Sequence, residues 1–301
     1  MKKHHVSDEW NSVKGHGNHE FVDVAINSDN LLFIDPVLIQ NNDDEWSIES
    51  NKLIQSFFDV FYEAYRQSDD IGKRKLLSHA GEQNGTRLGY GRGDNGKGNT
   101  AQGLLKIFSP LEKYIFNIST IGRAEDLHIL IPNFAEDGLS DLLTNILHDV
   151  LNQFTLYQMA KYGIKSNAFL KFWKWDGKWI EVERPAYCVE GKELLVVPKK
   201  MVRKKYLFSV HQYFHRIIIE RIRKDGGYMD NGKPISKREI IKMMRGAGDH
   251  WEYEDAISYT QKQDDALREY HEKLPLFYKG NGGFMEDHDL DGYIYGQSRN
   301  G

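Results

Sequence analysis

The apolar residues of this chain recur at helical spacing over several long stretches. Between Ile48 and Tyr65, for example, they stand at i, i+1 and i+4, the spacing of a helix with one face against a core. Pro110 interrupts one of these stretches, and we expect the helix to break there. The pattern predicts helices over residues 48–65, 100–116, 140–162, 206–223, 236–245 and 251–274.

Other apolar runs are too short for a helix and predict strands. The clearest signal is a hairpin, because Asp176-Gly177 separates two runs rich in tryptophan and this dipeptide favours a two-residue turn. Further strands are predicted over residues 21–26, 31–34, 127–131 and 194–197. Helices and strands do not alternate regularly, so the expected class is α+β, with mixed sheet elements, several amphipathic helices and a helical C-terminal part.

The net charge of −4 conceals three segments of different sign. Residues 1–150 carry 14 Lys and Arg against 23 Asp and Glu, residues 161–245 carry 21 against 9, and residues 246–301 carry 5 against 12. The basic segment is either a solvated face, paired in part with the acidic ends, or a surface that binds phosphate groups.

The change of sign near Gly163 coincides with the end of a predicted helix. We therefore expect an acidic α+β domain with a glycine-rich loop over residues 1–162. A basic domain of a hairpin and helices is expected over residues 163–275, and an acidic tail rich in Gly and Asp over residues 276–301.

Composition excludes several classes of protein. With 40% hydrophobic residues and 7 prolines, the chain is neither disordered nor fibrous. Cys188 is the single cysteine, which excludes an intrachain disulfide and a cysteine-based zinc or iron–sulfur site. The longest apolar stretch, residues 139–160, carries several polar side chains, and the start of the chain lacks the apolar segment of a signal peptide. We expect a cytoplasmic protein that does not span a membrane.

Carboxylates gather where a predicted strand leads through a loop into a predicted helix. Asp126 precedes the strand, Asp137 lies in the loop, Asp141 lies in the first turn of the helix, and Glu82 is a fourth candidate. Mg²⁺ prefers oxygen ligands and can support phosphodiester cleavage. These four residues are candidate catalytic groups, with Asp126, Asp137 and Asp141 as ligands of Mg²⁺. Alternatively, such residues near a helix start are ordinary capping groups.

The segment Gly91 to Thr100 comes close to a phosphate-binding loop, but Gly98 stands where that loop has Ser or Thr. No buried strand is predicted before it, so a surface loop is the simpler interpretation. Its cations are still candidates for contacting a nucleic-acid backbone, together with a basic run further along the chain. The candidate nucleic-acid-binding residues are Arg92, Lys97, Lys199, Lys200, Arg203, Lys204 and Lys205.

Two further motifs are incomplete in the sequence. His211 and His215 share one side of a predicted helix, but no third metal ligand accompanies them, so we interpret them as helix packing. Residues 287–294 match the first half of a calcium loop, but Ser298 stands where the loop has a bidentate Glu. We expect a solvated acidic terminus there.

Several short motifs resemble those of uncharacterised bacterial proteins from anti-phage defence and mobile-element loci. They fall within residues 20–205 and comprise Leu32–Pro36, Gly89–Gly98, Asp137–Asp141 with Thr144-Asn145, and Leu195–Lys199. The resemblance implies a defence function and a partner protein encoded beside this one. It implies no particular activity and no catalytic residues.

These observations lead to two hypotheses. The first is a Mg²⁺-dependent nuclease effector of a bacterial defence system, acting on nucleic acid. The second is a non-catalytic subunit of a defence complex that binds nucleic acid, or docks an ATPase partner, through the basic face.

Overall fold

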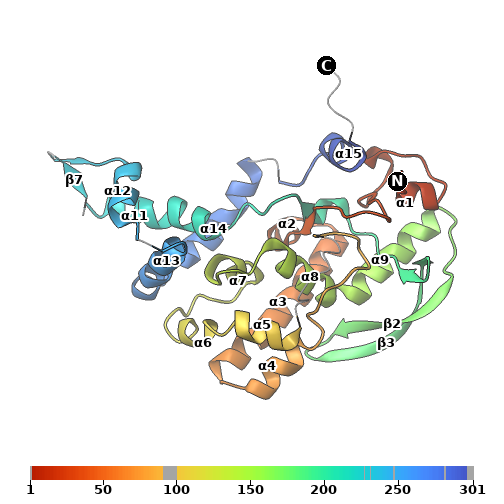
Figure 1. Cartoon of the computed structure of the whole chain (residues 1–301), viewed down its shortest axis with the longest axis horizontal. Helices are drawn as coiled ribbons and strands as arrows, with labels where there is room; N and C mark the ends of the chain where they lie inside the picture. The colour runs from red at the N-terminus through yellow and green to blue at the C-terminus, as the bar shows by residue number, and fades with distance from the viewer. Residues whose placement is uncertain are drawn as a thin grey trace.

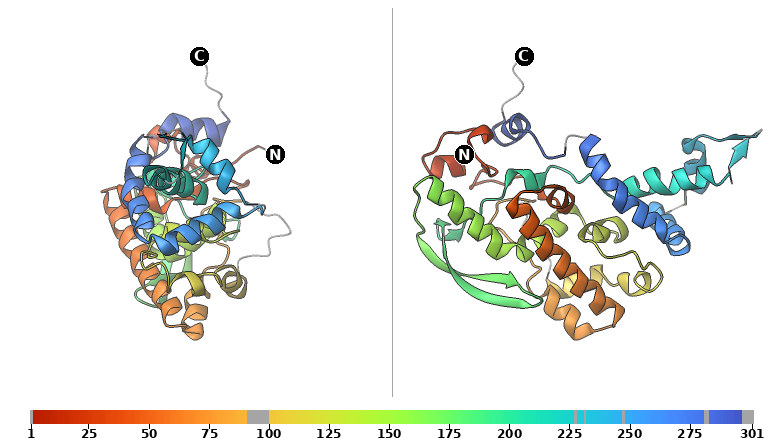
Figure 2. Two further views of the ribbon diagram at one scale, coloured as in Figure 1. Left: turned by 90° about the vertical axis from the view of Figure 1, so that its left-hand side faces the viewer. Right: turned by 180° about the vertical axis from the view of Figure 1, so that it is seen from behind.

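The computed structural model describes residues 2–90, 100–226, 228–230, 232–246, 248–280 and 283–296. It mixes helices with short antiparallel strand pairs and has a helical C-terminal part, so the expected α+β class is confirmed. A main body carries a projecting helical arm, residues 210–262 (Figure 1). The arm is also seen in profile from behind in Figure 2.

Helix α3 (Glu45–Arg66) organises the body, and its existence is as predicted. Asp44 caps it by accepting the N–H of Ser47, and its apolar stripe is buried against α2, α4, α7 and α8. The other helices of the body are α1 (Val6–Glu9), η1 (His16–Asn18), α2 (Pro36–Asn41), α4 (Asp70–Leu77), α5 (Ala101–Ile107), α6 (Leu111–Tyr114), α7 (Ala124–Leu130), α8 (Glu136–Ile146), α9 (His148–Lys161), η2 (Lys199–Met201) and α15 (Asp287–Tyr295). Helix α14 (Asp265–Gly280) joins the body to the arm, because it contacts α2 of the body as well as η3 (Phe214–Ile218) of the arm.

The predicted hairpin is confirmed, and it curves along the side of the body next to α9 (Figure 1). Trp175 and Trp179 face each other across its turn. The indole N–H of Trp175 donates to Ser56 Oγ (3.2 Å), which fixes this buried ring against α3. The strand pairs of the described residues are β1 (Phe33–Ile34) with β6 (Val202–Arg203), β2 (Ala168–Trp175) with β3 (Trp179–Ala186), β4 (Cys188–Val189) with β5 (Lys192–Glu193), and β7 (Met229–Asp230) with β8 (Lys233–Pro234).

Three of the predicted strands are wrong. Residues 127–131 belong to helix α7 and its C-cap, because Asp126 accepts the N–H of Arg123 and closes the first helical turn. Residues 194–197 are buried but do not form a ladder, and residues 21–26 form only isolated bridges. Short apolar runs are compatible with helix, strand or buried loop, so the pattern alone does not separate these states.

Two predicted helices are each divided in the structure. The stretch 140–162 breaks at Leu147 into α8 and α9, and the stretch 251–274 breaks at Gln263 into α13 (Trp251–Lys262) and α14. The predicted break near Pro110 is confirmed, with α5 before it and α6 after it.

The helical arm consists of two layers. One is a continuous rod of α10 (Val210–Tyr213), the π-helical turn η3 (Phe214–Ile218) and α11 (Ile219–Lys224). The other is α13, and α12 (Lys237–Met244) packs on α11 beyond the β7–β8 pair. The hydroxyls of Tyr213 and Thr260 are 2.8 Å apart and join the rod to α13.

The expectation of a solvated acidic terminus is wrong. Residues 287–295 form α15, which packs beside the N-terminal segment (Figures 1 and 2). Leu290 and Ile294 are buried, and Asp291 Oδ1 accepts the backbone N–H of His16 (2.9 Å) and lies 2.6 Å from its Nδ1. Asp291 therefore joins the two ends of the described chain.

A single hydrophobic cluster runs from Val6 to Ile294 and includes side chains of the body and the arm. The division into the segments 1–162, 163–275 and 276–301 stays a prediction. Among the helices of the described residues, none has both the length and the apolar character needed to cross a membrane.

Candidate functional site

One face of α8 binds residues 81–90, the segment that precedes the glycine-rich stretch. Asp137, Asp141 and Asn145 are four residues apart and so follow one line along the helix. The Asn145 amide donates to the Gly81 carbonyl (2.7 Å), and the Tyr90 N–H donates to Asp137 Oδ1 (2.9 Å). Residues 81–90 therefore lie along α8.

Asp141 lies in an unusually negative environment. It is 9% exposed, and burial together with the charges of Asp137 and Glu82 raises the pKa of its carboxyl to about 8, against the effect of a hydrogen bond from the Gln83 N–H. Burial and the charge of Glu82 also raise the pKa of the half-buried Asp137. We call Glu82, Asp137 and Asp141 the acidic cluster. It extends from the buried Asp141 to the exposed Glu82.

The approach of the chain to this cluster requires a glycine. Gly89 has a φ of +93°, and a Cβ at this position would lie 2.2 Å from Asp137 Oδ1. Its N–H also points to the carbonyls of Asn30 and Leu32 (3.0 and 3.1 Å), which anchor it beside β1. Any side chain here would displace the Asp137 carboxylate or the backbone.

Asp126 is not part of this cluster, although the sequence groups it with Asp137 and Asp141. It is fully buried in α7, where its Oδ1 lies 2.6 Å from His271 Nε2 of α14. Its Oδ2 accepts the N–H groups of Gly122 and Arg123, each at 2.9 Å. Both oxygens are thus engaged within the protein.

The carboxylates of the acidic cluster do not form a compact set of metal ligands. Within the described part of the chain, the ligand atoms of Glu82, Asp137 and Asp141 do not all come within 4.8 Å of one another.

The basic residues predicted between positions 199 and 205 divide into two groups. Lys199 Nζ donates to Asp287 Oδ1 (2.5 Å), and Arg203 donates to the Gly283 carbonyl, so these two cations are engaged with the segment around α15. The members that are exposed are Lys200, Lys204 and Lys205.

Aromatic rings connect one of the exposed lysines, Lys204, to the acidic cluster. Lys204 Nζ lies 4.1 Å from the centre of the Tyr293 ring. Burial, and then the proximity of Tyr90, raise the pKa of Tyr293. Tyr90 in turn binds Asp137 through its backbone and is 57% exposed. Carboxylates, an exposed aromatic ring and the exposed cation of Lys204 therefore follow one another along this surface.

Most of the chain matches one known protein family. A domain of unknown function, DUF8370, matches residues 12–209, which is more than half of the chain. The chain belongs to the DUF8370 family. No curated protein and no solved structure matches it. The acidic cluster, Asp126 and the basic residues 199–205 all lie within the DUF8370 match.

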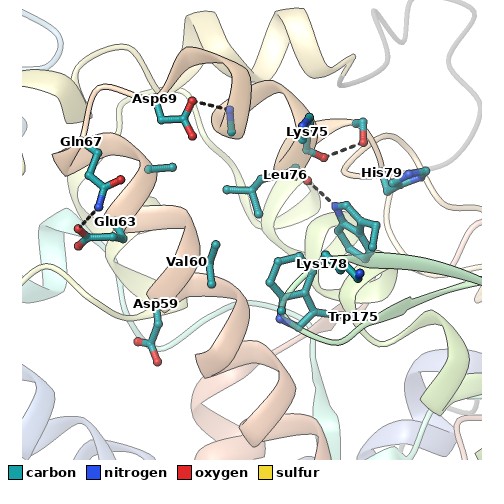
Figure 3. Close-up of a pocket in the computed structure, with 15 residues that line it drawn as sticks. Asp59, Val60, Glu63, Gln67, Asp69, Lys75, Leu76, His79, Trp175 and Lys178 are labelled. Carbon is teal, nitrogen blue, oxygen red and sulfur yellow. Dashed lines mark hydrogen bonds between the residues drawn. The ribbon is translucent and has the colours of Figure 1, made fainter.

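The DUF8370 region also contains a cavity of about 740 Å³ between α3, α4 and the hairpin turn (Figure 3). Asp59 and Glu63 of α3 line one side, and Trp175 and Trp179 line the other. The Trp179 indole N–H donates to the Leu76 carbonyl (2.9 Å), which holds this ring against α4. The tryptophans thus form part of the core wall, and the acidic cluster lies elsewhere.

Two pairs of residues singled out in the sequence lie elsewhere. Arg92 and Lys97 lie outside the described residues. His211 and His215 lie beyond the DUF8370 match and meet Glu252, a residue that sequence reasoning missed. Glu252 is 37 residues from His215 in the chain, and no motif spacing connects them.

Proposed function

We propose that this DUF8370 protein is a Mg²⁺-dependent phosphodiesterase, a nuclease, whose cation is held by Glu82, Asp137 and Asp141. The observation that carries the proposal is the environment of Asp141, a buried carboxyl whose charged neighbours are two further carboxylates. Like charges in a buried site are tolerated when a proton or a cation offsets them. Mg²⁺ meets this need and prefers oxygen ligands.

The neighbouring surface suits a nucleic-acid substrate. A bound Mg²⁺ polarises a phosphoryl oxygen and lowers the pKa of a coordinated water. Lys204 and Lys205 supply positive charge for the phosphate backbone, and the exposed ring of Tyr90 offers a stacking surface for a base. Asp126 has no part in this proposal, because its oxygens are already engaged.

The test is Asp141→Asn, assayed for folding and for cleavage of plasmid DNA and of RNA in Mg²⁺. Asn keeps a hydrogen-bond acceptor but loses the charge that binds the cation, so we expect a folded protein with cleavage reduced about 100-fold or more. Asp69→Asn is the matched control, because Asp69 lies outside the acidic cluster and its side chain caps α4 by accepting the Gly72 N–H (2.9 Å). We expect it to cleave like the unmodified protein.

A fully active Asp141→Asn variant would contradict the proposal. Salt-sensitive binding without cleavage in the unmodified protein would instead favour a non-catalytic subunit that binds nucleic acid. Binding of an ATPase without binding of nucleic acid would favour a docking subunit.

We further propose that the nuclease acts in the cytoplasm, as an effector of a bacterial defence system with a partner encoded beside it. The motif resemblance supports this setting, and a single cysteine is usual in a reducing compartment. In phage challenge, we expect protection with the unmodified protein and none with Asp141→Asn. Equal protection by the two would contradict a nuclease effector.

A further inference from the structure

Three metal-ligating side chains meet in the helical arm. His211 Nδ1 lies 3.0 Å from Glu252 Oε1, and His215 Nε2 lies 3.4 Å from the same oxygen. The three ligand atoms all lie within 4.8 Å of one another. We propose that His211, His215 and Glu252, the arm triad, bind a Zn²⁺ ion.

The local helix geometry brings the two imidazoles together. His211 belongs to α10 and His215 to the π-helical turn η3, and their ring centres are 4.0 Å apart. Short π-helical turns within α-helices occur frequently at functional sites. Glu252, in the first turn of α13, faces both rings from the second layer of the arm.

The interpretation of the histidine pair as packing alone does not fit this arrangement. The side chains of His211, His215 and Glu252 are 57%, 31% and 21% exposed, so an ion in solution can reach them. The sequence around the two histidines offers no third metal ligand, but Glu252 supplies one from the other layer of the arm.

The donor set favours zinc over the cation proposed for the acidic cluster. Two imidazole nitrogens and a carboxylate oxygen are usual ligands of Zn²⁺, whereas Mg²⁺ and Ca²⁺ prefer oxygen alone. Three protein ligands leave a fourth tetrahedral position open to water or a further ligand. A bound ion would also join α10 and η3 to α13, in addition to the contact of Tyr213 with Thr260.

The experiment uses the full chain stripped of metal and titrated with Zn²⁺ or Co²⁺. We expect binding of one ion at the arm triad, visible absorption of a tetrahedral Co²⁺ complex, and a rise in Tm of about 5 °C when free Zn²⁺ is about 100 times Kd. The absence of Co²⁺ absorption and of any Zn²⁺-dependent Tm rise would overturn the proposal.

Two variants assign the ion to the triad. Glu252→Gln and His215→Gln should each weaken Zn²⁺ binding about 10-fold or more, since each removes one ligand. His4→Gln is the matched control, because His4 also pairs with a glutamate, Glu9, at 2.9 Å but outside the triad. Unchanged affinity in both triad variants would overturn the assignment.

This proposal does not depend on the proposed nuclease. Asp141→Asn should leave the Zn²⁺ affinity unchanged, and Glu252→Gln should leave Mg²⁺-dependent cleavage unchanged. The two proposals can therefore fail separately.

Discussion

Asp126 and Asp141 are both buried acidic residues, on the adjacent helices α7 and α8, but their surroundings are opposite. Asp126 is offset by His271 and by two backbone N–H groups. Asp141 has the carboxylates of Asp137 and Glu82 as its charged neighbours. The negative charge of Asp126 is thus balanced by groups of the protein itself, whereas the charged groups around Asp141 have the same sign as its own carboxylate.

The comparison shows that burial alone does not identify a chemical site. A buried carboxylate with a full set of partners stabilises the fold and has no oxygen left for a ligand. A buried carboxylate among others of its charge has a perturbed pKa, and such groups concentrate at functional sites. Asp126 and Asp141 can therefore be distinguished by variants that remove one carboxylate at a time.

The largest effect is expected from Asp126→Ala. This change leaves His271 buried without its ionic partner, and removing one member of a buried pair costs about 3–5 kcal/mol. Urea denaturation followed by circular dichroism measures the loss. A decrease in the free energy of unfolding of less than about 1 kcal/mol would mean that the contact of Asp126 with His271 does not stabilise the fold.

A smaller effect is expected for Asp141, and it depends on pH. The pKa of Asp141 in the folded protein, about 8, is higher than in the unfolded chain, so the folded state binds more protons between pH 4 and pH 8. Its contribution to stability is therefore present at low pH and lost as the pH rises to about 8.

Asp141→Asn should remove this loss, so that in metal-free buffer at pH 8 the variant is more stable than the unmodified protein by about 1–3 kcal/mol. Saturating Mg²⁺ should restore the stability that the unmodified protein loses at pH 8, and it should leave the stability of the variant unchanged. Chemical denaturation from pH 5 to pH 8, with and without Mg²⁺, measures both. Parallel pH profiles for the two proteins would show that Asp141 is not perturbed.

The smallest effect on stability is expected for the exposed lysines Lys204 and Lys205. Lys204→Glu with Lys205→Glu should leave Tm nearly unchanged, while the slope of log K against log salt for nucleic-acid binding should flatten by about two units. Lys171→Glu, on the hairpin, is the control and should keep the slope. An unchanged slope in the double variant would remove these lysines from the interface.

Local sequence signals predicted much of the fold. The apolar stripe of α3 and the turn at Asp176-Gly177 depend on neighbours in the chain, and both are confirmed. Helix α7 was predicted as a strand because its apolar run is short, although Asp126 and the N–H of Arg123 form a capping contact that favours a helix.

The candidate sites were harder to predict, because their members come from distant segments. Asp137 and Asp141 are four positions apart and could be grouped from the sequence, although the predicted helix begins at residue 140 and places Asp137 in the loop before it, whereas α8 begins at Glu136 and includes both. Glu82 joins them through the segment 81–90. The pairing of Asp126 with His271 spans 145 positions, and no periodic pattern relates the two residues. Glu252 likewise comes from a distant part of the sequence, and it reaches the arm triad through the packing of α13 on α10.

The contact between His16 and Asp291 also has a consequence for biosynthesis. These residues are 275 positions apart, and at a synthesis rate of about 5–20 residues per second they leave the ribosome roughly 14–55 seconds apart. During that interval His16, which is fully buried in the folded protein, has no carboxylate partner. The N-terminal segment thus reaches its final packing only after α15 has been translated.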